Sequence, residues 1–173
     1  MYDHTLKIVH EEFVKPEIVD LISEQKWDEL YDIEISTCVL PAAGTAYRRS
    51  LLERHGKLSG SYRLVEDYSL HLRLLSEKTK IFWLDIKSVK HRTGGVSHSE
   101  NDEVSLTALY YMRDLANSFL LEVYPNAERF SAEAFERSYR MFVWNSGVFA
   151  EYYRRFFRNL RTEEERQKYR TLV

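Results

Sequence analysis

Apolar residues recur at intervals of three and four over several stretches of the first half of the chain, which predicts amphipathic helices. The first stretch covers residues 13–31, with Pro16 near its expected start. A second helix is expected over 45–55, where Gly56 suits a left-handed C-cap. A third is expected over 65–78, where tyrosine and leucine side chains share one stripe.

Two shorter stretches have the character of strands. In residues 32–40, Ile33 and Ile35 begin an alternation of apolar and less apolar positions, which is typical of a strand. Residues 81–91 predict a short extended pair. Three candidate strands are fewer than the roughly 4–6 of a usual sheet. We therefore expect the first part of the chain to belong to something larger.

After residue 99 the pattern becomes helical throughout. Residues 104–124 place apolar side chains on one face, and Ser131 opens another helical stretch that we expect to break near residues 145–147. Thr162 and Glu165 have the spacing of a capping box for a last short helix.

The order of these elements predicts an α-rich α/β protein in two regions. Residues 1–99 would form a partial α/β domain with a small mixed sheet, and residues 100–173 a helical appendage.

Composition narrows the classes of function. The 173 residues carry 25 basic and 27 acidic side chains, and this net charge of −2 argues against a nucleic-acid partner. The lone Cys38 excludes an internal disulfide and fits a reducing compartment. No apolar run reaches the ~20 residues that span a bilayer, and the first residues lack a signal-peptide core. These features predict a cytoplasmic protein.

The pair Glu66-Asp67 is the strongest candidate for chemistry. Both carboxylates fall in the first turn of the helix expected over 65–78, where the helix dipole favours them by ~0.3–1 kcal/mol each. Neighbouring helical positions point about 100° apart, so only one of the two can address a substrate. Whether the pair serves catalysis or only caps the helix stays open at this point.

The residues around this pair give a family resemblance. The stretches 44–75 and 81–99 resemble the second half of the catalytic domain of family 2 glycosyltransferases, which have the GT-A fold. The matching elements are Gly44, Arg48 or Arg49, Gly56, Glu66-Asp67, Leu70, Arg73, His91-Arg92 and Ser97. Each is weak alone, and their order and spacing carry the resemblance. The expected fold is therefore a partial GT-A-like domain with a helical appendage.

The resemblance implies an inverting transfer of a sugar from a nucleotide-diphosphate sugar to the hydroxyl of a sugar or lipid-linked acceptor, as in the synthesis of cell-surface polysaccharides. Asp67 would be the general base and Glu66 its support. Gly44 and Thr45 would border the acceptor by family position. No Q-x-x-R-W signature of the processive polymer synthases occurs in the chain.

The sequence contains only some of the residues that the family uses to bind the nucleotide-sugar donor. Arg92, Gly94 and Gly95 would contact the donor phosphates, since a forked donor beside two glycines suits an anion; the alternative is a plain connector. The family also implies a divalent cation, Mg²⁺ or Mn²⁺, on a D-x-D motif that this sequence lacks. The nearest match, residues 32–34, reads as a strand edge, so no metal ligand is assigned. We expect a fragment of a longer enzyme, inactive alone.

An aromatic and basic stretch lies near the end of the sequence. Residues 149–161 set six apolar side chains on one helical stripe, with four arginines outside it. This pattern fits packing on the preceding helices, and it also fits peripheral contact with an acidic membrane. The alternative to an enzyme is accordingly a non-catalytic helical module for protein interaction or membrane contact. Exposed apolar surface would also favour a homo-oligomer.

Overall fold

The computed structural model of the chain describes residues 14–86 and 106–169, and within these ranges it contains helices and no strand. In chain order the elements are α1 (Pro16–Ser23), α2 (Trp27–Thr37), α3 (Arg49–Arg54), α4 (Glu66–Ser76), α5 (Leu106–Ser118), the π-helical turn η1 (Phe119–Val123), the 3-10 turn η2 (Tyr124–Arg129), α6 (Ala132–Asn159) and α7 (Glu163–Tyr169). The α/β class, the small mixed sheet and the GT-A-like fold predicted from the sequence are therefore wrong.

The stretch expected as a strand over 32–40 lies mostly in α2. Its buried side chains are Leu30, Tyr31, Glu34 and Ile35, a spacing of three and four that only a helix places on one face. Asp28 and its neighbour in the first turn favour the helix start. The alternation that suggested a strand spans too few positions to exclude a helix, because both periods fit a short run.

The single helix expected over 13–31 is divided in two. Gln25 has a φ of 59°, and the chain turns there between α1 and α2. The Lys26 amide donates to the Leu21 carbonyl at 2.9 Å, which satisfies the end of α1. Tertiary packing therefore overrides a continuous helical pattern at this point.

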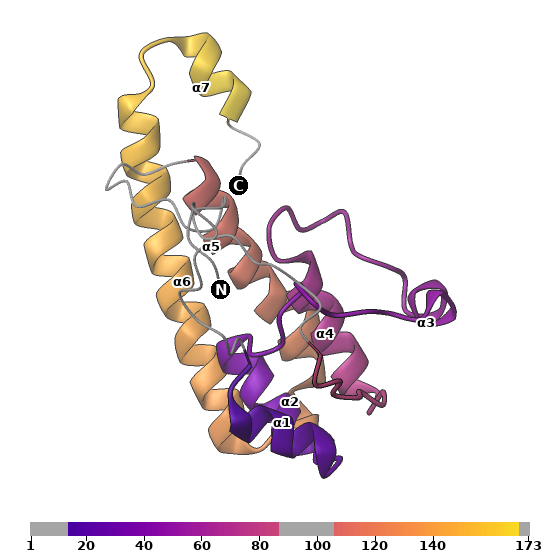
Figure 1. The fold of residues 1–173 in the computed structure, drawn as a ribbon. Coiled ribbons are helices and arrows are strands. Elements are labelled where there is room, and N and C mark those ends of the chain that lie inside the picture. Colours follow the sequence, from indigo (N-terminus) through magenta and orange to yellow (C-terminus); the bar gives the residue numbers. More distant parts are fainter. Residues whose placement is uncertain (1–13, 87–105, 170–173) are drawn as a thin grey trace.

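Helices α5 and α6 form an antiparallel hairpin through η1 and η2 (Figure 1). Ser131 caps α6 as expected, since its hydroxyl accepts from the Ala134 amide at 3.2 Å. The expected break at residues 145–147 does not occur, and α6 continues for 28 residues. Buried Asn145 and the open space beside Gly147 are accommodated within the helix.

One hydrophobic core joins α1, α2, α4, η1 and α6. Its members include Ile18, Leu30, Leu72, Phe119 and Ala134, all at most 5% exposed. Two side-chain hydroxyls also donate hydrogen bonds to one backbone carbonyl of α2.

That carbonyl belongs to Ile35, near the end of α2. It accepts hydrogen bonds from the Tyr68 hydroxyl of α4 and from the Ser138 hydroxyl of α6, each at 3.0 Å. Because both donors are buried, the two bonds hold three helices at a fixed relative position.

The helices expected on either side of the polar loop 57–64 are both present. The first, α3, is shorter than predicted and projects from the body of the molecule between two long connections (Figure 1). Gly56 follows it with a φ of +81°, a left-handed conformation that favours glycine, as expected. The second, α4, matches its predicted range closely and buries seven of its eleven residues.

Residues 81–86, predicted as part of an extended pair, form no strand with any described residue. Ile81 is partly buried against the core, but the later side chains are strongly exposed: Phe82 is 78%, Leu84 68% and Ile86 66% accessible. The described part of the chain offers no sheet neighbour for them.

Candidate functional site

The beginning of α4 places Glu66 and Asp67 in its first turn, after Val65 as the N-cap residue. No side chain caps this end, so its first backbone N–H groups favour a nearby negative charge. Both acidic side chains are half-buried. Within residues 14–86 and 106–169, no hydrogen bond or ion pair involves the Asp67 carboxylate.

The Asp67 charge acts on side chains from three other parts of the fold. Burial raises the pKa of the Tyr47 phenol to about 12, and the negative charges of Asp67 and Glu34 add to the rise. Burial and the nearby Cys38 and Asp67 raise the pKa of Tyr111 on α5 in the same way. Both phenols are therefore protonated at neutral pH.

Cys38, the C-cap residue of α2, belongs to the same group. The residue is exposed as a whole, but neighbouring groups displace water from its sulfur and raise the pKa of the thiol. The charges of Glu34 and Asp67 add to this rise. The thiol is therefore neutral at pH 7 and a poor nucleophile.

A buried polar network lies beneath this group. Glu34 of α2 is 0% exposed, and its Oε2 accepts from the Val39 amide at 2.6 Å and from the Leu40 amide at 3.1 Å. Its other oxygen, Oε1, lies 3.5 Å from Nδ1 of His71, which is 3% exposed. His71 Nε2 lies 2.5 Å from the Tyr47 hydroxyl. The network thus bonds His71 of α4 to the loop before α3, while Glu34 Oε1 and His71 Nδ1 face each other without a hydrogen-bond partner among the described residues.

The sequence did not reveal this network. The sequence predicts a strand edge at residues 32–34, which gives no indication that Glu34 is buried. A buried glutamate is recognisable only once α2 is known to be a helix, because Glu34 then shares a face with Leu30 and Ile35. Asp32 points elsewhere and accepts from the Ser131 hydroxyl at 2.7 Å, so residues 32–34 are not a paired metal motif.

The loop that precedes α4 is held by a second buried carboxylate. Asp114 of α5 is fully buried, and its Oδ2 accepts from the amides of Arg63 and Leu64 at 2.6 and 2.8 Å. Its Oδ1 accepts from the Arg113 guanidinium at 2.7 Å. These bonds position the residues directly before Glu66.

The predicted acceptor residues lie in a turn that leads to Tyr47. Gly44 has a φ of +90°, and the Thr45 amide donates to the Ala42 carbonyl at 3.1 Å. The Thr45 hydroxyl donates to the carbonyl of Pro41. Both residues are exposed. They lie in the segment between Cys38 and Tyr47, and the Asp67 charge raises the pKa of both of these flanking residues.

Other residues of the family pattern lie apart or outside. Arg49 pairs with Glu53 at 2.8 Å on the exposed α3, and Arg73 donates to the Lys57 carbonyl at 3.0 Å. The predicted phosphate contacts Arg92, Gly94 and Gly95, together with His91 and Ser97, lie outside the described residues.

Two cavities lie away from Asp67. One, of about 250 Å³, adjoins Trp27 and Trp83. The other, of about 690 Å³, lies between the end of α6 and α7. No group of three His, Cys, Asp or Glu side chains in residues 14–86 and 106–169 is arranged to hold a metal ion.

Comparison of the chain with protein-family models, with curated proteins and with solved structures found no match.

Proposed function

We propose that this chain carries the acceptor-side part of an inverting glycosyltransferase, with Asp67 as the general base. The proposal rests on the residue order shared with family 2 glycosyltransferases and on the surroundings of Asp67, and not on a GT-A sheet. The observation that carries it is a half-buried carboxylate in the first turn of α4 with no partner among the described residues. A carboxylate serving only structure is usually bonded, as Glu34 and Asp114 are.

The proposed reaction transfers one proton and one glycosyl group. The acceptor oxygen attacks the anomeric carbon from the face opposite the leaving group and forms the new C–O bond. The bond from that carbon to the diphosphate breaks, and its electron pair leaves with the nucleoside diphosphate. The acceptor proton passes to the Asp67 carboxylate, a step worth ~10²–10⁴ in rate.

Other residues have supporting roles in this scheme. Glu66 supports Asp67, and the neutral Tyr111 phenol is able to donate a hydrogen bond to an acceptor hydroxyl. Gly44 and Thr45 border the acceptor, and Arg92, Gly94 and Gly95 contact the donor phosphates. A divalent cation would neutralise the leaving diphosphate, and we assign it no ligand among the described residues.

The test is a transfer assay on the full-length protein with a panel of nucleotide sugars. Asp67→Asn should lower the transfer rate at least ~100-fold while leaving the free energy of unfolding within ~0.5 kcal/mol of the parent. Asp28→Asn is the matched control, because Asp28 also lies in the first turn of a helix and is exposed. Near-normal turnover by Asp67→Asn would remove Asp67 from the mechanism.

A non-catalytic interaction module is the second candidate. The observation that favours it is the exposed apolar run at residues 81–86, since such patches commonly mark an interface. This candidate predicts no transfer or donor hydrolysis with any nucleotide sugar. It also predicts that Leu84→Ser reduces self-association in analytical ultracentrifugation, whereas Asp67→Asn does not.

A further inference from the structure

Helix α6 changes its electrostatic character along its length. In its first half, Arg137 and Arg140 each form an ion pair with a glutamate four residues earlier. In its second half, the side chains of Arg155 and Arg158 form no hydrogen bond or ion pair with any residue that the structure describes. The second half therefore holds positive charge that the described residues do not neutralise.

The local charge is opposite to that of the whole protein. Residues 146–161 contain four arginines and one acid, Glu151, which is a net charge of +3 in a chain of net −2. Glu151 pairs with Arg154. A basic segment on an acidic protein attracts an anionic partner and is screened by salt.

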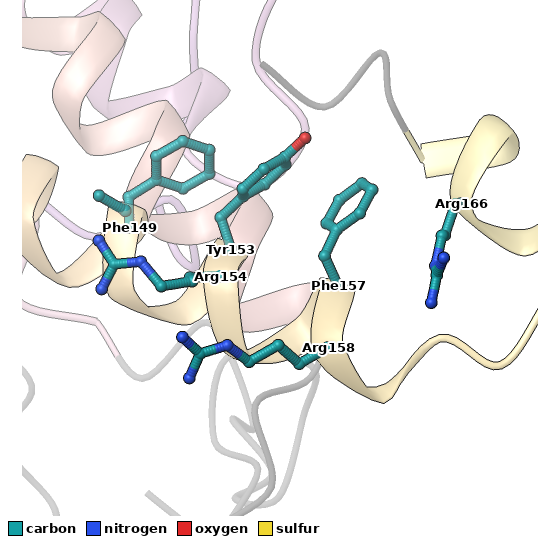
Figure 2. Close-up of a pocket in the computed structure, with 7 residues that line it drawn as sticks. Phe149, Tyr153, Arg154, Phe157, Arg158 and Arg166 are labelled. Carbon is teal, nitrogen blue, oxygen red and sulfur yellow. The ribbon is translucent and has the colours of Figure 1, made fainter. Parts of the chain in front are cut away.

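The apolar side of this segment is a row of rings. Phe149, Tyr153 and Phe157 follow one another at four-residue steps, with ring centroids 5.9 and 4.3 Å apart (Figure 2). The row extends over nine residues, which places its first and last rings about 12 Å apart along the helix. The end of α6 reaches beyond α5 toward α7 (Figure 1), and the three rings are only half-buried.

A shallow, open hollow lies at the end of α6, and Phe149, Tyr153 and Phe157 line it. Arg154 and Arg158 border it on α6, and Arg166 borders it from α7 (Figure 2). The hollow is thus lined by both aromatic and cationic side chains.

We propose that this end of α6, with its ring row and with Arg154, Arg155 and Arg158 on the other sides of the helix, docks on an anionic phospholipid surface. Aromatic rings insert at the boundary between headgroups and acyl chains, while arginines extend toward phosphate. Each arginine near such a surface contributes about 1 kcal/mol of attraction. No helix among the described residues is long and apolar enough to cross a bilayer.

Charge complementarity and shape favour lipid over other anions. A row of rings along one exposed helix end suits an extended surface. An acidic protein segment or a single-stranded nucleic acid would also meet the positive charge, and both serve as competing outcomes below. The proposal is independent of sugar transfer, so failure of one leaves the other standing.

The experiment is co-sedimentation of the full chain with vesicles of phosphatidylcholine alone and with vesicles that also contain phosphatidylglycerol. We expect pelleting with the anionic vesicles at low salt and its loss at high salt. The double variant Arg155→Gln with Arg158→Gln should bind the anionic vesicles about thirty-fold more weakly, from two lost charges.

Arg137→Gln with Arg140→Gln is the matched control, because it removes the same charge from the other half of the same helix. It should leave binding within about twofold, since both arginines are already paired. Phe157→Ala should weaken the binding that remains at intermediate salt, where charge is screened. Far-UV circular dichroism verifies that each variant retains its helices.

Three results would overturn the proposal. The first is no pelleting on anionic vesicles at low salt. The second is an equal loss of binding in both arginine pairs, which would indicate a nonspecific effect of charge. The third is tight binding of an acidic peptide or a single-stranded oligonucleotide in the absence of any vesicle binding.

Discussion

Charged side chains near the start of α4 and at the end of α6 differ in their burial and in their hydrogen bonding. Near α4, Glu34 and Asp114 are fully buried and bonded to backbone amides. At the end of α6, Arg155 and Arg158 are exposed and have no partner among the residues described. The first arrangement fixes the positions of chain segments, and the second leaves charge available to a partner.

The buried carboxylates contribute to the stability of the fold, whereas the exposed arginines remain available to bind a partner. Removing a buried carboxylate that accepts hydrogen bonds from two amides strongly lowers the free energy of unfolding, because the amides then lack an acceptor. An exposed arginine contributes little to folding and can be replaced without structural change. Asp67 stands between these extremes, half-buried yet without a described partner, which is why we assign it a chemical role.

The largest expected effect comes from Glu34. Replacing it by alanine leaves the Val39 and Leu40 amides without their acceptor, and we expect a loss of about 3 kcal/mol in the free energy of unfolding. Glu34→Gln should lower the free energy of unfolding by less, because the side-chain amide oxygen can still accept hydrogen bonds from these amides. Urea denaturation measures both. Glu29→Ala, an exposed change on the same helix, should stay within about 0.5 kcal/mol; equal losses at both positions would contradict the comparison.

The next effect is a loss of stability at alkaline pH. Burial raises the pKa of Tyr47, and of Tyr31, from 10 to about 12 in the folded protein. The folded state therefore holds these protons more tightly than the unfolded state. The contribution of these two phenols to the free energy of unfolding is fully present below pH 10 and is lost as pH rises toward 12.

Urea unfolding between pH 9 and about 12 measures this decline, and Tyr47→Phe should flatten it. Absorbance at 295 nm should show Tyr47 ionising late in the folded protein. A Tyr47→Phe variant with an unchanged pH dependence would indicate that this phenol titrates normally.

A smaller effect is expected at the beginning of α6. Ser131→Ala removes the acceptor of the Ala134 amide and the hydrogen bond to Asp32, so we expect a loss of about 1 kcal/mol. Thermal or urea unfolding measures the change. Ser131→Asp should not restore full stability, because its charge would face Asp32. A loss below about 0.3 kcal/mol would show that the cap is dispensable.

The smallest effect is expected beyond the other end of α6. Thr162 and Glu165 form a capping box for α7, with the Glu165 amide donating to the Thr162 hydroxyl at 3.1 Å and the Thr162 amide donating to the Glu165 carboxylate at 3.1 Å. Thr162→Ala should change the global free energy of unfolding by less than about 0.5 kcal/mol, because residues 163–167 of α7 are exposed and none of them belongs to the main core. Hydrogen exchange should become faster in α7 alone. A global loss as large as that of Ser131→Ala would mean that α7 belongs to the cooperative unit.

Local signals in the sequence predicted several elements correctly. The stripe of α4, the cap at Ser131 and the capping box at Thr162 depend on residues within one or two turns of each other. The first-turn position of Glu66 and Asp67 has the same origin. Gly56 was predictable because a left-handed residue after a helix favours glycine.

Tertiary structure decided what these signals could not. The run at 32–40 fits two periods equally well, and burial of Glu34 with Leu30 against α4 and α6 selects the helix. The Glu34–His71–Tyr47 network joins residues up to 37 positions apart, so no local pattern reveals it. Sequence alone determined where charge, rings and caps lie along the chain. Only packing determined which of those charges are buried and which remain exposed, because burial depends on neighbours distant in sequence.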